Sequence, residues 1–108
     1  MDIIENFLSL LNKGQDSALL RYSLGNEYFK RGEQDAAVEH LTRAVQQDEN
    51  YSAAWKMLGR ALTEAGRHEE AADALERGIT VAERKGDAQA AKEMQVFLKR
   101  SRRKLEET

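Results

Sequence analysis

Two histidines, His40 and His68, are the residues of this 108-residue chain whose chemistry is most often catalytic. A histidine beside a carboxylate could act as a general acid or base near neutral pH. His40 lies inside a predicted helix and His68 at the start of another, so we expect both side chains at the surface. The chain contains neither the H-E-x-x-H pattern of zinc peptidases nor the G-x-S-x-G pattern of serine hydrolases. No catalytic residue is predicted, and we expect the protein not to be an enzyme.

Carboxylates and glycines are abundant, but neither forms the pattern of a cofactor or metal site. Glu69, Glu70 and Asp73 lie together on what reads as the solvated face of a helix. The glycines are not followed by the G-K-[ST] sequence of a phosphate-binding loop. The chain has no cysteine, which removes disulfides, thiol chemistry and the ligand that most zinc sites use. We therefore expect no cofactor and no metal.

A basic cluster near the C-terminus is the best candidate for nucleic-acid binding. Its members are Lys99, Arg100, Arg102, Arg103 and Lys104. Positive charges are favoured at a helix C-terminus by the helix dipole alone, and Glu106 and Glu107 follow directly. No aromatic residue is interleaved to stack on bases. Nucleic-acid or polyanion binding through this basic C-terminal helix is therefore an alternative function, and the sequence argues against it as the main one.

The composition is that of one soluble helical domain covering residues 1–108. Charged residues make up 33% of the chain, aromatic residues 6%, and proline is absent, which favours helices over sheets. The hydrophobic fraction of 41% is enough for a core. The start of the chain is acidic, unlike a signal peptide, and no apolar run approaches the roughly 20 residues of a membrane span. We expect a cytoplasmic protein without membrane contact.

The elements that would position any site follow from an internal repeat with a period of 34 residues. The first copy contains, in order, Leu24, Gly25, Tyr28, Gly32, Ala37, Leu41, Arg43 and Ala44. The second copy has the counterparts Leu58, Gly59, Leu62, Gly66, Ala71, Leu75, Arg77 and Gly78. A weaker third copy, at an offset of 36 residues from the second, consists of Ala91, Met94 and Leu98. A fixed period of this size is typical of stacked helical repeats.

Apolar spacing and helix-end residues divide the chain into six predicted helices. A capping helix lies within residues 1–14, repeat 1 covers 18–51, repeat 2 covers 52–85, and a second capping helix lies within 86–108. The predicted N-caps are Asp16 or Ser17, Ser52 and Asp87. The predicted left-handed helix ends are Gly14, Gly32, Asn50, Gly66 and Gly86.

The expected core is the apolar face of each repeat helix and of the last helix. Its expected members are Leu20, Leu24, Tyr28, Ala37, Val38, Leu41, Ala44, Val45, Ala54, Trp55, Leu58, Leu62, Ala65, Ala71, Ala72, Leu75, Ile79, Ala82, Ala91, Met94 and Leu98. Gly25 and Gly59 lie among these large residues, where a missing side chain lets another helix approach closely. Gly78 lies inside a helix, which predicts a packing reason for its presence.

The first helix has an apolar face of its own, which includes Ile3, Ile4, Phe7 and Leu8. Our main expectation is that it covers the end of the stack in a monomer. The alternative is a homo-oligomerisation surface, in which the same face joins two copies of the chain.

The repeat resembles the tetratricopeptide repeat family, whose motif reads W-x2-L-G-x2-Y and then A-x3-F. The second copy matches this motif as Trp55-x2-Leu58-Gly59-x2-Leu62 and Ala71-x3-Leu75. The first copy matches it as Leu24-Gly25-x2-Tyr28 and Ala37-x3-Leu41, with Arg21 in place of the tryptophan. The closing proline of the motif is absent from both copies, where Glu49 and Glu83 stand.

The resemblance implies antiparallel helix pairs in a right-handed superhelix, with a concave groove lined by the first helix of each pair. It implies an adaptor that holds a peptide or helix of a partner protein, without naming that partner. Registration with the motif places in this groove Tyr22, Asn26, Phe29, Lys56, Arg60, Thr63, Lys92, Val96 and Lys99. The first part of the groove is aromatic and the later part cationic. The expected ligand therefore carries an apolar anchor at one end and acidic residues at the other.

Overall fold

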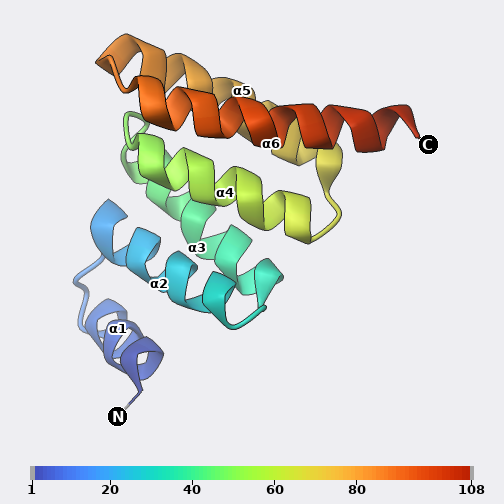
Figure 1. Cartoon of the computed structure of the whole chain (residues 1–108). Coiled ribbons are helices and arrows are strands. Elements are labelled where there is room, and N and C mark those ends of the chain that lie inside the picture. The colour runs from blue at the N-terminus through green and yellow to red at the C-terminus, as the bar shows by residue number, and fades with distance from the viewer. Residues whose placement is uncertain (1, 108) are drawn as a thin grey trace.

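The computed structural model describes residues 2–107, which form six α-helices and no strand. In chain order the helices are α1 (Ile3–Asn12), α2 (Ala18–Lys30), α3 (Gln34–Gln47), α4 (Ser52–Glu64), α5 (His68–Lys85) and α6 (Ala88–Glu106). Figure 1 shows a stack that starts with α1 at one end and closes with α5 and α6 at the other. The prediction of an all-α fold with six helices is confirmed.

Side-chain caps and glycines end most of these helices where the sequence predicts. The Ser17 hydroxyl accepts a hydrogen bond from the Leu20 N–H at the start of α2. The Asp87 carboxylate accepts one from the Ala90 N–H at the start of α6. Positive φ angles of 76 to 83° follow four of the helices, at Gly14, Gly32, Gly66 and Gly86.

Two predictions about the connection between α3 and α4 are wrong. Asn50 is not left-handed, because no non-glycine residue of the described chain has a positive φ angle. The chain turns there through Asp48, whose carboxylate accepts a hydrogen bond from the Asn50 N–H at 3.0 Å. Ser52 is the buried first residue of α4 rather than its N-cap, and Tyr51 takes the cap position without a side-chain hydrogen bond.

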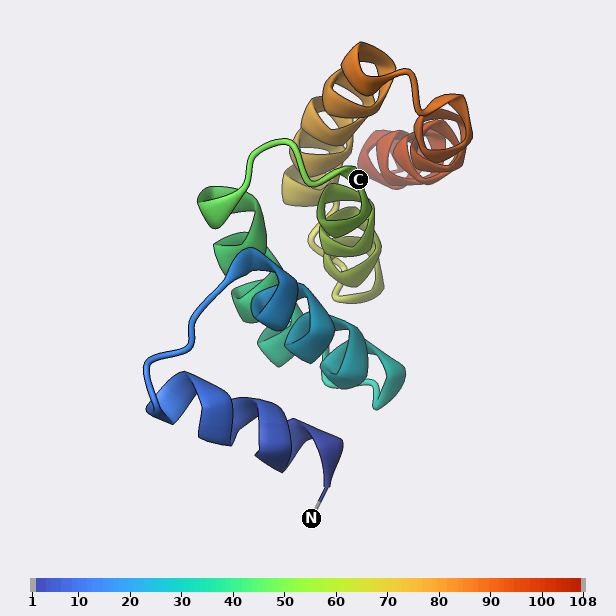
Figure 2. The same cartoon turned by 90° about the vertical axis from the view of Figure 1, so that its left-hand side faces the viewer.

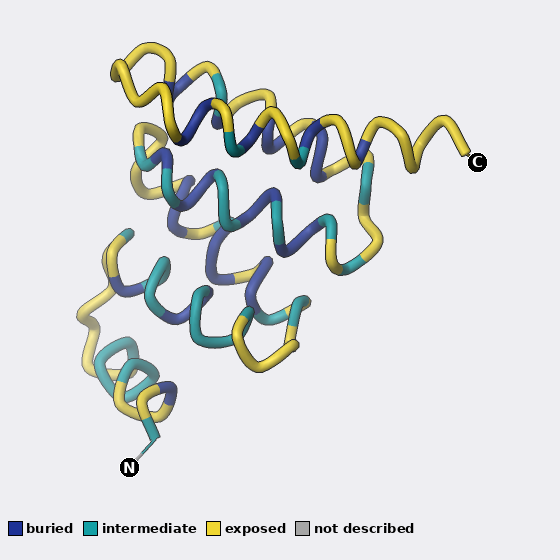
Figure 3. Tube along the Cα trace, in the orientation of Figure 1, coloured by how far each residue is buried: buried dark blue, intermediate teal, exposed yellow. Residues whose placement is uncertain are grey.

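The helices form two rows, with α2, α4 and α6 along one side and α3 and α5 along the other (Figures 1 and 2). Each helix packs against the next one in the chain, and α4 also contacts α2 and α6. The buried residues gather between the two rows (Figure 3). The molecule is elongated, with extents of 43 × 31 × 18 Å.

The core has nearly the composition that the repeat predicts. All the expected core residues are buried except three that are half-buried, namely Tyr28, Ala65 and Ile79. Val81 and Ser101 are buried although the repeat does not predict them. A second, smaller cluster at the end of the stack joins α1 to α2 through the buried residues Ile4, Leu20 and Leu24.

Glycines at helix crossings set the distance between paired helices. A Cβ atom at Gly25 would overlap the side chain of Leu41, and one at Gly59 would overlap Leu75, both at less than 3.0 Å. Both leucines are fully buried, so neither has room to move aside. Gly78 is also a close contact, because a Cβ there would lie 2.5 Å from the Met94 sulfur. The expected packing reasons for these glycines are present.

This contact predicts that Gly59→Ala destabilises the fold, although alanine is the better helix former. Overpacking against Leu75 should lower the free energy of unfolding by about 1–3 kcal/mol, and Gly59→Val should lower it further. Urea denaturation of both variants measures the effect. Adding Leu75→Ala to Gly59→Ala makes room for the new methyl group, so the double variant should lose less than the sum of the single changes. Full additivity of the two changes would contradict the contact.

Candidate functional site

The predicted groove residues of α2 lie in a line along one face of that helix. Tyr22, Asn26 and Phe29 are all half-buried. The Tyr22 ring packs at 4.9 Å from that of Tyr51 at the start of the next repeat. The side-chain oxygen of Asn26 is buried without a hydrogen-bond partner in the described chain. Two aromatic rings therefore line the first part of the face, and the unsatisfied acceptor of Asn26 is buried beneath it.

Arg60 of α4 is held between aromatic rings of the two neighbouring helices. Its guanidinium carbon lies 4.9 Å from the ring centre of Phe29 and 5.3 Å from that of Phe97. The Arg100 guanidinium lies 5.3 Å from the same Phe97 ring. Cation–π contacts of this kind contribute about 0.5–1 kcal/mol each at exposed sites. The predicted groove residues Phe29 and Arg60 are thus brought together, and Phe97 joins them.

The other two predicted residues of α4 contact α6. The Lys56 ammonium pairs with the Glu93 carboxylate at 2.8 Å, and this hydrogen bond holds the pKa of Glu93 below its ordinary value. The Thr63 hydroxyl donates to the Gly59 carbonyl at 2.7 Å and lies 3.3 Å from the hydroxyl of Ser101. Lys56 is therefore paired with a carboxylate of the chain itself, which reduces the positive charge expected for this part of the face.

The predicted residues of α6 are exposed and form no hydrogen bond, ion pair or ring contact with α4 in the described chain. Lys92 and Lys99 are open to solvent, and Val96 is 51% exposed. Their neighbours Glu93 and Phe97 make the contacts to α4 instead. The motif does not place Glu93 and Phe97 in the groove, because the third copy of the repeat follows the second at an offset of 36 residues instead of 34.

Leu19 is an apolar residue of this face that the sequence reading missed. Its side chain is 65% exposed in the first turn of α2. It precedes Tyr22, Asn26 and Phe29 by three, seven and ten residues, so helical spacing places it on their face. This helical spacing is the signal in the sequence from which Leu19 could have been placed on the face.

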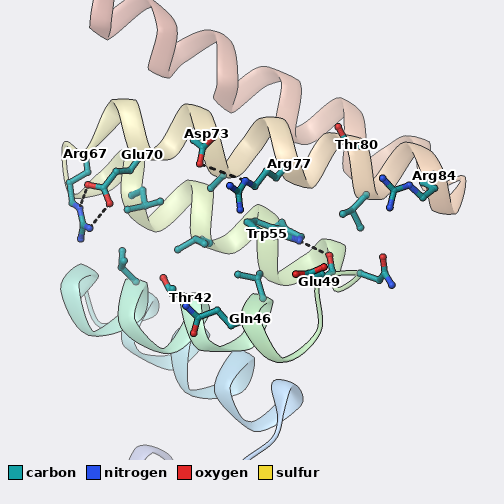
Figure 4. Close-up of a pocket in the computed structure, with 17 residues that line it drawn as sticks. Thr42, Gln46, Glu49, Trp55, Arg67, Glu70, Asp73, Arg77, Thr80 and Arg84 are labelled. Carbon is teal, nitrogen blue, oxygen red and sulfur yellow. Dashed lines mark hydrogen bonds and ion pairs between the residues drawn. The ribbon is translucent and has the colours of Figure 1, made fainter.

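A cavity of about 690 Å³ lies between α3 and α5, on the opposite row from the predicted groove (Figure 4). Trp55, Leu58 and Leu62 of α4 line it, and all three are buried. Its rim includes the ion pair Arg67–Glu70, at 2.7 Å. More than half of the residues that line the cavity are polar or charged, and some of those charges are paired with one another, so it is the weaker candidate for a binding surface.

The expectation that His40 is a surface residue is wrong. His40 is buried at 8% exposure, and its ring stacks at 5.5 Å on that of Tyr28. Its Nδ1 lies 3.1 Å from the guanidinium of Arg21, which in turn forms two hydrogen bonds to Asp16, each 2.8 Å long. Burial and the neighbouring Arg21 lower the pKa of His40 below its ordinary value of 6.5. The tertiary packing of α2 on α3, which periodicity does not show, buries this ring.

His68 is the half-buried first residue of α5, with its Nδ1 buried and unpaired in the described chain. Within residues 2–107 no group of three or more His, Cys, Asp or Glu side chains is placed to hold a metal ion. Among the same residues, no helix has the length and apolar character needed to cross a membrane.

The profile described as tetratricopeptide repeat matches residues 22–91 of this chain. The chain belongs to the tetratricopeptide repeat family. A TPR repeat-containing protein of Pseudomonas aeruginosa is 48% identical over 98 residues, which are 91% of this chain and 93% of that protein. The resemblance to the tetratricopeptide repeat family is therefore confirmed by the profile and by the relative from Pseudomonas aeruginosa.

Solved structures show the same fold. The solution structure of a protein from Bordetella parapertussis superposes with a TM-score of 0.81 and 42% identity, covering 95% of this chain and 90% of that one. The crystal structure of MamA superposes with a TM-score of 0.66 and 27% identity, covering 96% of this chain and 67% of that one. Tetratricopeptide repeats generally mediate protein–protein interaction, and proteins built from them are generally non-enzymatic scaffolds.

The lowered pKa of His40 predicts a pH dependence of stability. The unfolded chain binds a proton at His40 more readily than the folded chain, so the free energy of unfolding should fall as the pH drops below the ordinary value of 6.5. His40→Gln should remove this part of the dependence. Urea denaturation at about pH 7 and pH 5 measures it, since the carboxylates titrate mainly below that range. Equal losses in both proteins would contradict the assignment to His40.

Proposed function

We propose that this protein is a cytoplasmic, non-enzymatic adaptor that binds a peptide or helix of a partner protein on the face formed by α2, α4 and α6. The observation that carries the proposal is the line of exposed and half-buried side chains along α2, in a family whose members generally bind proteins. The exposed side chain of Leu19 and the half-buried Tyr22 offer a ligand apolar contact at the start of the face. The half-buried side chain of Asn26 lies beside them.

The later part of the face favours an acidic ligand, because it carries positive charge. It offers fewer free cations than the sequence predicts. Glu93 neutralises Lys56, so Arg60, Lys92 and Lys99 supply the positive charge. Arg60 is pre-oriented by its two aromatic neighbours, which reduces the entropy it loses on meeting a carboxylate. Charges of this kind mainly set orientation and association rate, whereas the apolar anchor supplies most of the affinity.

The length of the face limits its affinity. Two helix pairs and a closing helix offer few contacts to a ligand. An isolated peptide should bind with a dissociation constant that is micromolar or higher, which corresponds to a binding free energy of about 8 kcal/mol or less in magnitude.

The proposal predicts that changes on this face remove partner binding. Leu19→Ala or Tyr22→Ala should each weaken the binding of a partner by about 2 kcal/mol, roughly a 30-fold loss of affinity, because each removes an apolar anchor. Arg60→Glu should slow association with an acidic ligand. Affinity capture from the native source with wild type and with each variant identifies the partners that depend on the face, and titration of the purified partner measures the affinity.

Arg77→Glu is the matched control, since Arg77 is an exposed cation at the rim of the cavity between α3 and α5. A partner that is lost with Arg77→Glu and retained by all three face variants would move the site to that cavity. Retention of binding at high salt separates a protein ligand from nucleic acid, because phosphate contacts weaken steeply with salt.

A further inference from the structure

The helix α1 occupies the place of the second helix of a repeat whose first helix is missing. Moving α3 back by the period of 34 residues places it over the position of α1. The shift makes Ile3, Phe7 and Leu10 the counterparts of Ala37, Leu41 and Ala44. In α3 these three residues are fully buried. Leu41 meets Gly25 of the paired first helix.

In α1 the corresponding residues lack such a partner. Ile3 is 44% exposed, and Phe7 and Leu10 are half-buried. We call Ile3, Phe7 and Leu10 the end strip, because they lie on the side of α1 where the missing helix would pack. Ile4 is buried against α2 in the smaller core cluster. Phe7 and Leu10 also contact that cluster while staying half-buried, so Ile3 is the most exposed residue of the end strip.

We propose that the end strip joins two copies of this chain in an antiparallel, two-fold symmetric contact between their α1 helices. The side chains fit this arrangement better than a repeat-like partner helix. The paired helices of a repeat approach closely because alanine flanks leucine on the second helix and glycine lies opposite. Ile3 and Leu10 replace both alanines, so a helix that needs that short distance would overlap them.

Two end strips are complementary to each other. In an antiparallel pair centred between Asn6 and Phe7, Ile3 of each copy lies opposite Leu10 of the other, and large side chains interlock at ordinary helix separations of about 8–10 Å. Four acidic and four basic residues balance within residues 2–31, so two copies do not repel at this end.

The other end of the stack argues for a closed dimer rather than a chain of copies. The exposed face of α6 is mostly polar, although Val96 and Leu105 are exposed on it, and Gln95 stands where α4 has the close-contact glycine Gly59. A further helix could not pack on α6 as α5 packs on α4, so head-to-tail growth is blocked. Because each copy has one self-complementary end, association stops at the dimer.

The experiment compares oligomeric state across concentration, using sedimentation equilibrium of the full chain. α1 has 10 residues and a length of about 15 Å, so the contact is smaller than the roughly 1,200 Å² of standard complexes and should be weak. The average mass of wild type should rise from 12.3 kDa toward twice that value as concentration increases. Ile3→Glu should stay monomeric and folded, since the residue is exposed and an acidic side chain suits the first turn.

Val96→Glu is the matched control, because Val96 is a similarly exposed apolar residue on α6 at the other end. It should dimerise like wild type. A wild type that remains at 12.3 kDa at every concentration would overturn the proposal. A dimer that is dissociated by Val96→Glu but not by Ile3→Glu would also overturn it.

The symmetry has its own test, because the chain has no cysteine. Asn6 is exposed beside the two-fold axis, three residues after Ile3 and four before Leu10. Asn6→Cys should therefore form a covalent dimer rapidly under mild oxidation. Glu5→Cys, equally exposed on the opposite side of α1, should cross-link far more slowly. Equal rates in the two variants would contradict the antiparallel contact.

Discussion

The close approach of the two helices in each repeat is the constraint on which the rest of the structure depends. Gly25 and Gly59 have no side chain, and Leu41 and Leu75 fill the space that they leave. A larger residue at either glycine would push the paired helices apart and change the angle between successive pairs. The positions of the candidate binding residues on α2 and α4 depend on these two contacts, because those two helices carry the glycines.

The sequence was sufficient for features that depend on local or periodic rules. Residue type predicts the helix ends at glycines and the caps Ser17 and Asp87. The 34-residue period predicts nearly the whole core. The failures arise where distant side chains decide. His40 is buried because Tyr28 and Arg21 cover it, and neither contact can be derived from periodicity.

The candidate site shows the same division. The period locates the residues of α2 and α4 on the expected helices, whereas their binding role stays a prediction. Structure was needed to show that Glu93 pairs with Lys56 and that Phe97 stacks on Arg60. Both contacts tie α6 to α4, so a ligand that engaged Arg60 would also act on the packing of the closing helix. Ligand affinity and the stability of that helix are therefore linked.

The two ends of the stack differ in a way that bears on how the binding face is used. The exposed face of α6 is mostly polar, whereas the α1 end presents the end strip. A contact between end strips lies across the end of the stack, while the proposed ligand lies along α2, α4 and α6. The two contacts use different residues, so dimerisation would leave both faces free. Two weak faces on one dimer would bind a partner that carries two ligand segments much more tightly than either face alone, which offsets the limit that a short groove sets on affinity.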